Sequence, residues 1–171
     1  MSTTRRRWLS LTVGVAFGYL LIGANPLKAQ GDCKAVLDAT TKVYDTPTHA
    51  YVTMNLGGKP QSGESIFTGG MVYAKYDGKW SAGSTTREIK EITEKNWQKN
   101  KTVCRYLKDE PVNGEMAAVY SVHEVAPNST SDSTIWISKA KGLPLRSDED
   151  LGGGKTHLST RYEYGNVKPP I

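Results

Sequence analysis

The residue types that most often perform chemistry in proteins are few in this chain of 171 residues, and they do not converge. The three histidines, His49, His123 and His157, lie far apart with no HxH or HxxxH spacing, which favours surface histidines over metal ligands. No GxSxG segment marks a serine nucleophile, and no glycine-rich loop matches a phosphate-binding motif. The sequence therefore predicts no metal site, no cofactor and no enzyme activity.

Two charged groups of residues could be mistaken for binding sites. Asp148, Glu149 and Asp150 are consecutive, but consecutive strand residues point to opposite faces, so the three carboxylates cannot meet on one ion. We expect their strand to turn its acids towards solvent. No stripe of cations with interleaved aromatics is formed by the lysines, which argues against a nucleic-acid partner; these are Lys75, Lys79, Lys99 and Lys101.

Cys33 and Cys104 are the only cysteines, 71 positions apart. Redox catalysis uses a CxxC pair and a zinc site needs more ligands nearby, and neither is present. In an oxidising compartment an isolated pair predicts one structural disulfide.

Residues 1–29 have the pattern of an export signal. Three arginines, at positions 5–7, precede an apolar stretch of about 15 residues and a small residue, Ala29, after which we expect cleavage. The alternative is a retained anchor, and the triple arginine leaves both the general and the twin-arginine route open. Four of the basic residues and no acid lie in this segment, so the net charge of +5 falls to +1 for residues 30–171. The sequence thus predicts an exported protein with no stable membrane span after cleavage, and the nearly neutral charge of residues 30–171 argues against an anionic partner.

Residues 30–171 are long enough for one domain with a real core. Helical spacing predicts a helix over 33–44, begun by Asp32, and a short amphipathic helix over 85–96. A polar loop is expected at 127–133. Period-two alternation and turn residues predict strands over 49–56, 64–68, 71–76, 79–81, 102–107, 115–125, 134–138, 145–151 and 156–164. The expected class is α+β with one large antiparallel sheet.

Three of these strands carry apolar side chains at alternate positions, which places them on one face. The candidate binding residues are Val52, Met54, Leu56, Tyr120, Val122, Leu158 and Tyr162. Such sets can line a concave hollow for an acyl chain, or they can pack an ordinary core against the helices. The spacing alone leaves both interpretations open.

Two late segments carry a resemblance to a known family. Thr134-Ile-Trp-Ile-Ser-Lys-Ala-Lys-Gly-Leu-Pro-Leu-Arg146 and Arg161-Tyr-Glu-Tyr-Gly-Asn-Val-Lys-Pro-Pro170 resemble the LolA/LolB-like periplasmic lipoprotein-carrier superfamily. The resemblance implies a sheet curved into an unclosed half-barrel, with a hollow that is lidded by helices and holds acyl chains. It also implies that Cys33 and Cys104 pin the first helix onto the sheet. The carrier's functional arginine has no unique counterpart among Arg87, Arg105, Arg146 and Arg161.

The predicted function is a non-catalytic periplasmic binding protein that holds a lipid, an acyl chain or a lipid-modified partner in an apolar hollow. The alternative is an envelope interaction or stress-sensor protein that uses the outer sheet face and the 127–133 loop against a protein partner.

Overall fold

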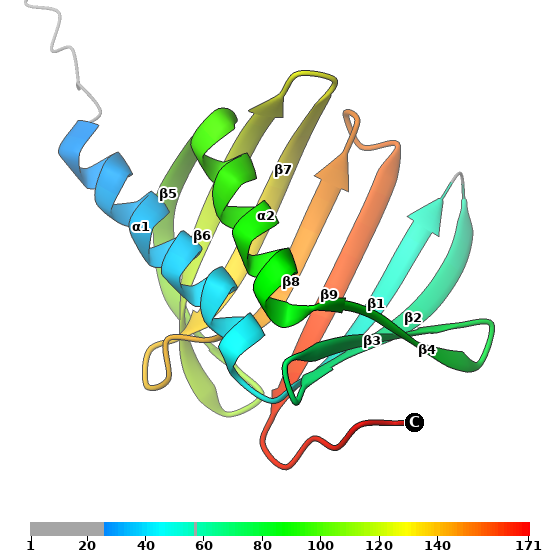
Figure 1. Cartoon of the computed structure of the whole chain (residues 1–171). Helices are drawn as coiled ribbons and strands as arrows, with labels where there is room; N and C mark the ends of the chain where they lie inside the picture. Colours follow the sequence, from blue (N-terminus) through cyan, green and yellow to red (C-terminus); the bar gives the residue numbers. More distant parts are fainter. Residues whose placement is uncertain (1–25, 57) are drawn as a thin grey trace, which may run out of the picture.

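The chain folds into two α-helices and one antiparallel sheet in a computed structural model that describes residues 26–56 and 58–171. Helix α1 spans Pro26–Lys42 and continues into a 3-10 turn, η1, at Val43–Asp45, and helix α2 spans Thr86–Lys99. Figure 1 shows both helices on the same face of the sheet. The predicted α+β class is confirmed.

Nine strands build the sheet within the described residues: β1 (Thr48–Leu56), β2 (Lys59–Thr68), β3 (Met71–Tyr76), β4 (Lys79–Thr85), β5 (Lys101–Val112), β6 (Glu115–Ala126), β7 (Ser129–Ser138), β8 (Pro144–Leu151) and β9 (Thr156–Tyr164). Their order is β4-β3-β2-β1-β9-β8-β7-β6-β5, and neighbours are antiparallel. The edge strands β4 and β5 do not pair, so the sheet curves around the helices without closing (Figure 1). The predicted half-barrel is confirmed.

Two of the predicted hairpins turn at residues with left-handed backbone conformations. Asp77 and Gly78 have φ values of 48° and 75°, and Asn113 and Gly114 have values of 51° and 83°. A two-residue type I′ turn requires positive φ at both positions, which Asn-Gly and Asp-Gly tolerate best. These short turns determine the register of β3 with β4 and of β5 with β6.

Helix α2 begins one residue after the predicted start at 85 and ends three residues after the predicted end at 96. Thr85 is its N-cap: the Thr85 hydroxyl accepts from the Glu88 backbone N–H at 3.2 Å, and Glu88 Oε2 accepts from the Thr85 N–H at 2.9 Å. This capping box satisfies two backbone donors that a helix start otherwise leaves unpaired.

Helix α1 begins earlier than expected, at Pro26 rather than at Cys33. Asp32 is therefore not its N-cap; the Asp32 carboxylate instead accepts a hydrogen bond from the Tyr106 backbone N–H at 3.0 Å. Tyr106 lies on edge strand β5, whose free backbone donors need partners, and the Asp32 carboxylate supplies one. Residues 1–25 of the predicted signal lie outside the described residues, and 26–29 form the first turn of α1.

The core lies where α1 packs on β5, β6 and β7. Its buried members come from the helix and all three strands: Val36, Ala39, Cys104, Val122 and Ile137. The predicted disulfide is confirmed, since the Cys33 and Cys104 sulfurs are 2.09 Å apart. It ties α1 to β5, as the family resemblance implied.

The expected polar loop at 127–133 is wrong. Strand β7 begins at Ser129, and residues 129–134 pair with β6 from Ala126 to Ser121. Backbone pairing on both sides, with β6 and β8, overrides the weak strand preference of serine and aspartate. Among the described residues, no helix combines the length and the apolar character that crossing a membrane requires.

Candidate functional site

The predicted binding residues share the sheet face that the helices occupy. Val122 on β6 packs against α1. It begins a row of directly opposed residues that crosses the sheet through Ser133 on β7, Glu149 on β8, Leu158 on β9 and Met54 on β1. Directly opposed residues in a sheet point the same way, so Met54 faces the helices as Val122 does. The other predicted residues lie on this face by alternation along β1, β6 and β9.

The structure divides these residues into two groups. Val122 is 7% exposed inside the core, and Tyr120 packs against that core. We call this region the covered half, formed under α1 by Cys104, Tyr120, Val122, Ile135 and Ile137.

The second group lies on the central strands β1 and β9, outside the main contacts of α1. We call it the open strip, formed by Val52, Met54, Leu56 and Leu158 with Tyr162 at one end. Leu56 is 50% exposed, and the other members are partly buried. The Tyr162 hydroxyl lies 3.4 Å from the Ser147 hydroxyl, and burial raises the pKa of Tyr162. The open strip is thus an apolar surface in contact with solvent.

A polar zone separates the covered half from the open strip. Ser133 and Glu149 lie between Val122 and Leu158 in the cross-strand row, so the expectation that the acids of β8 all face solvent is wrong for Glu149. Burial raises the pKa of the Glu149 carboxyl; a hydrogen bond from Ser131 opposes this and the Glu124 carboxylate adds to it. The sheet face that was predicted to be apolar therefore carries a carboxyl group. The sequence contained a signal for this position: residues alternate between faces along a strand, so Glu149 must point away from the face of Asp148 and Asp150.

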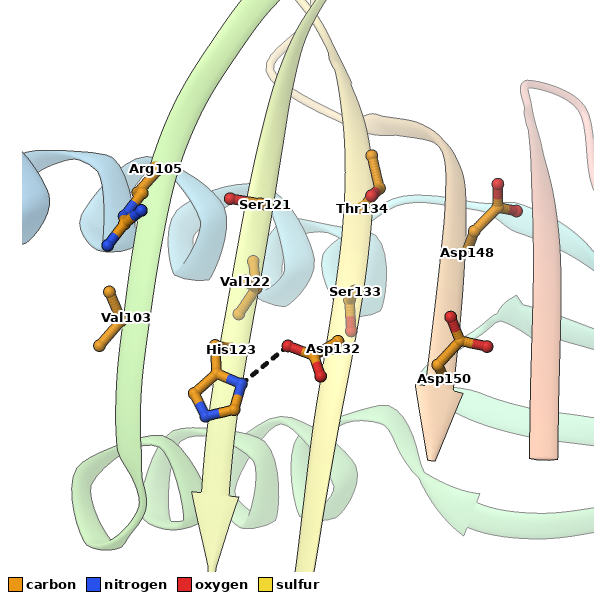
Figure 2. A pocket seen from close by; sticks show the side chains of 10 residues that line it. All are labelled: Val103, Arg105, Ser121, Val122, His123, Asp132, Ser133, Thr134, Asp148 and Asp150. Carbon is orange, nitrogen blue, oxygen red and sulfur yellow. Dashed lines mark hydrogen bonds and ion pairs between the residues drawn. The ribbon is translucent and has the colours of Figure 1, made fainter. Parts of the chain in front are cut away.

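The opposite face of the sheet contains a groove of about 480 Å³, which we call the outer groove. Figure 2 shows it with the helices behind the strands and its charged side chains in front. The lining residues come from β5 to β8, and those with side chains on the outer face are Val103, Arg105, Ser121, His123, Asp132, Thr134, Asp148 and Asp150. Val122 and Ser133, whose side chains face the helices, complete the lining. Sequence reasoning did not find this site, because its residues come from four strands.

The histidines lie on this outer face and each bonds a carboxylate. His49 Nε2 is 2.9 Å from Glu64, His123 Nδ1 is 2.7 Å from Asp132, and His157 Nδ1 is 2.9 Å from Asp150. Within residues 26–56 and 58–171, no three metal-binding side chains are grouped to hold an ion.

A row of cations and aromatics crosses seven strands of the outer face, and of the four lysines that were expected to form no stripe only Lys75 belongs to it. Its members, in cross-strand order, are Trp136, Arg146, Arg161, Tyr51, Glu64, Lys75 and Trp80. The Arg161 guanidinium lies 4.2 Å from the Tyr51 ring centre, and Lys75 Nζ lies 5.6 Å from that of Trp80. Carboxylates pair with Arg146, Arg161 and Lys75, so the row offers phosphate groups little free positive charge.

Comparison with known proteins identifies the fold. No protein-family model matches the chain, and no curated protein sequence gives a significant match. The lipoprotein LppX of Mycobacterium tuberculosis is similar in structure, with a TM-score of 0.53 over 86% of this chain and 100% of its own, at 14% identity. MucB in complex with MucA(peri) gives 0.51 over 81% of this chain and 57% of its own, at 13% identity. The chain therefore has the LolA-like fold that the resemblance of its late segments predicted.

Proposed function

We propose that the chain is a non-catalytic periplasmic protein that binds a lipid, an acyl chain or a lipid-modified partner on the open strip. The observation that carries this proposal is the exposure of Leu56, next to Met54 and Leu158, on the face that should supply the core. A soluble protein gains stability by burying such a strip, and exposed apolar patches mark binding surfaces. Each methylene group of a ligand buried there would contribute about 0.8 kcal/mol.

Two features support a role in holding a partner. LppX is a lipoprotein, and MucB was solved in complex with MucA(peri), so proteins of this fold include a lipoprotein and a member of a protein complex. The export signal over residues 1–29 belongs to the same proposal, because it would deliver the chain to the compartment where lipoproteins are sorted.

Native mass spectrometry of the protein purified from the periplasm tests the proposal. We expect a co-purified lipid that Leu158→Gln removes, with the melting temperature lowered only slightly. Glutamine is preferred to aspartate because Glu149 lies directly opposite Leu158 and would repel a second carboxylate.

Val103→Gln is the matched control, since Val103 is 46% exposed but lies on the outer face. It should leave lipid retention unchanged. A wild-type protein without bound lipid, or a folded Leu158→Gln protein that retains as much lipid as the wild type, would overturn the proposal.

A further inference from the structure

The outer groove has charges of opposite sign on its two walls. One row of directly opposed residues runs from Arg105 on β5 to Asp148 on β8, with Ser121 on β6 and Thr134 on β7 between them. The next row runs from Val103 through His123 and Asp132 to Asp150. A cation and an apolar side chain therefore form the β5 wall, carboxylates form the far wall, and two hydroxyls lie between them (Figure 2).

The charges on these walls differ in how they are paired. Arg105 is exposed and forms no ion pair with any described residue. Asp148 is bound by Arg146 and by the Ser159 hydroxyl, whereas Asp132 and Asp150 have only histidines as partners. Three carboxylates thus face one groove, and the only guanidinium bonded to any of them is that of Arg146, which binds Asp148. The groove retains a free cation at one wall and an excess of negative charge at the other.

Asp132 and Asp150 are also direct cross-strand neighbours. Like charges in this position destabilise a sheet, because their carboxylates lie close together on one face. A positively charged group bound between them would relieve that repulsion, and an anionic group bound at Arg105 would complete the complementarity. The groove therefore matches a ligand that carries both charges.

The separation of the two walls limits the class of ligand. Strands β5 and β8 are three strand spacings apart, roughly 14 Å. The opposite charges of a zwitterionic lipid headgroup are only a few bonds apart and cannot reach both walls. Nucleic acid would bring phosphates against three carboxylates. In an extended peptide, side chains four residues apart are separated by about 13 Å, which matches the groove.

We propose that the outer groove binds an extended segment of a protein partner, lying across β5 to β8, with an acidic side chain at Arg105 and a basic side chain four residues away at Asp132 and Asp150. Ser121 and Thr134 supply hydroxyls beneath the segment, and Val103 supplies an apolar contact at its acidic end. This site lies on the face opposite the open strip, so it is independent of lipid binding.

Titration of the isotope-labelled protein with the capped peptide acetyl-Glu-Ser-Thr-Ser-Lys-amide tests the proposal by nuclear magnetic resonance. We expect saturable shifts of backbone amides at the groove, including those of Arg105, Thr134 and Asp150. Arg105→Glu should weaken binding by about fivefold or more. Loss of a strong exposed ion pair accounts for about fivefold, and repulsion between the new carboxylate and the peptide's glutamate adds to it. The same variant should bind the peptide with Lys in place of Glu more tightly than the wild type does.

Arg87→Glu on α2 is the matched control, because it makes the same charge change on an exposed residue at the other face of the sheet. It should leave the peptide affinity unchanged, and Arg105→Glu should leave lipid retention unchanged. The proposal fails if no groove amide shifts saturably at millimolar peptide, or if both charge reversals weaken binding equally. It fails as well if an all-glutamate peptide or anionic phospholipid vesicles bind the groove as tightly.

Discussion

The covered half and the open strip belong to one sheet face and have the same alternation of apolar side chains, but only one of them is core. Val122, in the covered half, is 7% exposed, and Leu56, in the open strip, is 50% exposed. The difference lies in what packs above them: α1 crosses β5 to β7, and its disulfide to Cys104 holds it there. An apolar strand pattern therefore marks a face that can be buried, and the position of the helix decides whether it is.

Truncation in the covered half should have the largest effect on stability. Ile137→Ala should lower the free energy of unfolding by about 2–5 kcal/mol, because it leaves a cavity against α1. Leu158→Ala in the open strip should lower it by less than about 1 kcal/mol, since a partly exposed side chain loses less burial. Chemical denaturation of both variants measures the difference. Equal losses would mean that the two regions are equally packed.

Removal of the disulfide should have the next largest effect. Cys33→Ser combined with Cys104→Ser should lower the free energy of unfolding by about 2–4 kcal/mol, because the unfolded chain loses its cross-link. Denaturation with and without reductant checks this value. Below the melting temperature the double variant should retain lipid as the wild type does. Loss of lipid from the folded variant would show that the open strip depends on the α1 anchor.

Loss of the α2 cap should have a smaller effect. Thr85→Ala should lower the free energy of unfolding by about 1 kcal/mol, because the Glu88 N–H loses its acceptor. Thr85→Ser keeps the hydroxyl and should be close to the wild type. If alanine and serine give the same melting temperature, the capping box contributes nothing to stability.

The smallest expected effect is the change in melting temperature with pH that comes from two carboxyl groups on opposite faces of the sheet, Glu149 and Glu64. Burial raises the pKa of Glu149, so the folded state disfavours the ionised carboxylate. The free energy of unfolding therefore falls as the pH rises from the ordinary carboxyl pKa through the raised pKa of Glu149. Glu149→Gln should therefore raise the melting temperature at pH 7. The gain should disappear below about pH 4.3, where the unfolded carboxyl is also protonated.

Glu64, on the outer face, should give a pH dependence of stability with the opposite sign. The hydrogen bond from Lys75 lowers the pKa of Glu64, and His49 lowers it further. Its stabilising effect is present above the ordinary carboxyl pKa and is lost as the pH falls through the lowered one. Glu64→Gln should lower the melting temperature at pH 7 and have no effect in strong acid. Differential scanning at several pH values tests both variants, and the same sign for both would contradict the assigned environments.

Local features of the sequence were sufficient for most of the elements. The Asp77-Gly78 and Asn113-Gly114 turns, the Thr85 cap and the period-two strands act over a few residues, and the structure contains them. The two larger errors arose where a distant strand supplied the decisive partner. Ser129–Ser133 became a strand because β6 and β8 pair with it. The Asp32 carboxylate accepts a hydrogen bond from the Tyr106 backbone N–H on β5 and does not cap a helix start.

Sequence patterns were enough to predict the alternation of each strand, the disulfide pair and the class of fold, because these depend on neighbouring residues or on a unique pair of cysteines. Only the tertiary structure placed Glu149 between Val122 and Leu158, and Arg105 across the outer groove from Asp150. Cross-strand register decides which distant residues become neighbours, and a register set jointly by all the hairpins is not encoded in any single segment. Both candidate binding surfaces of this protein arise from that register.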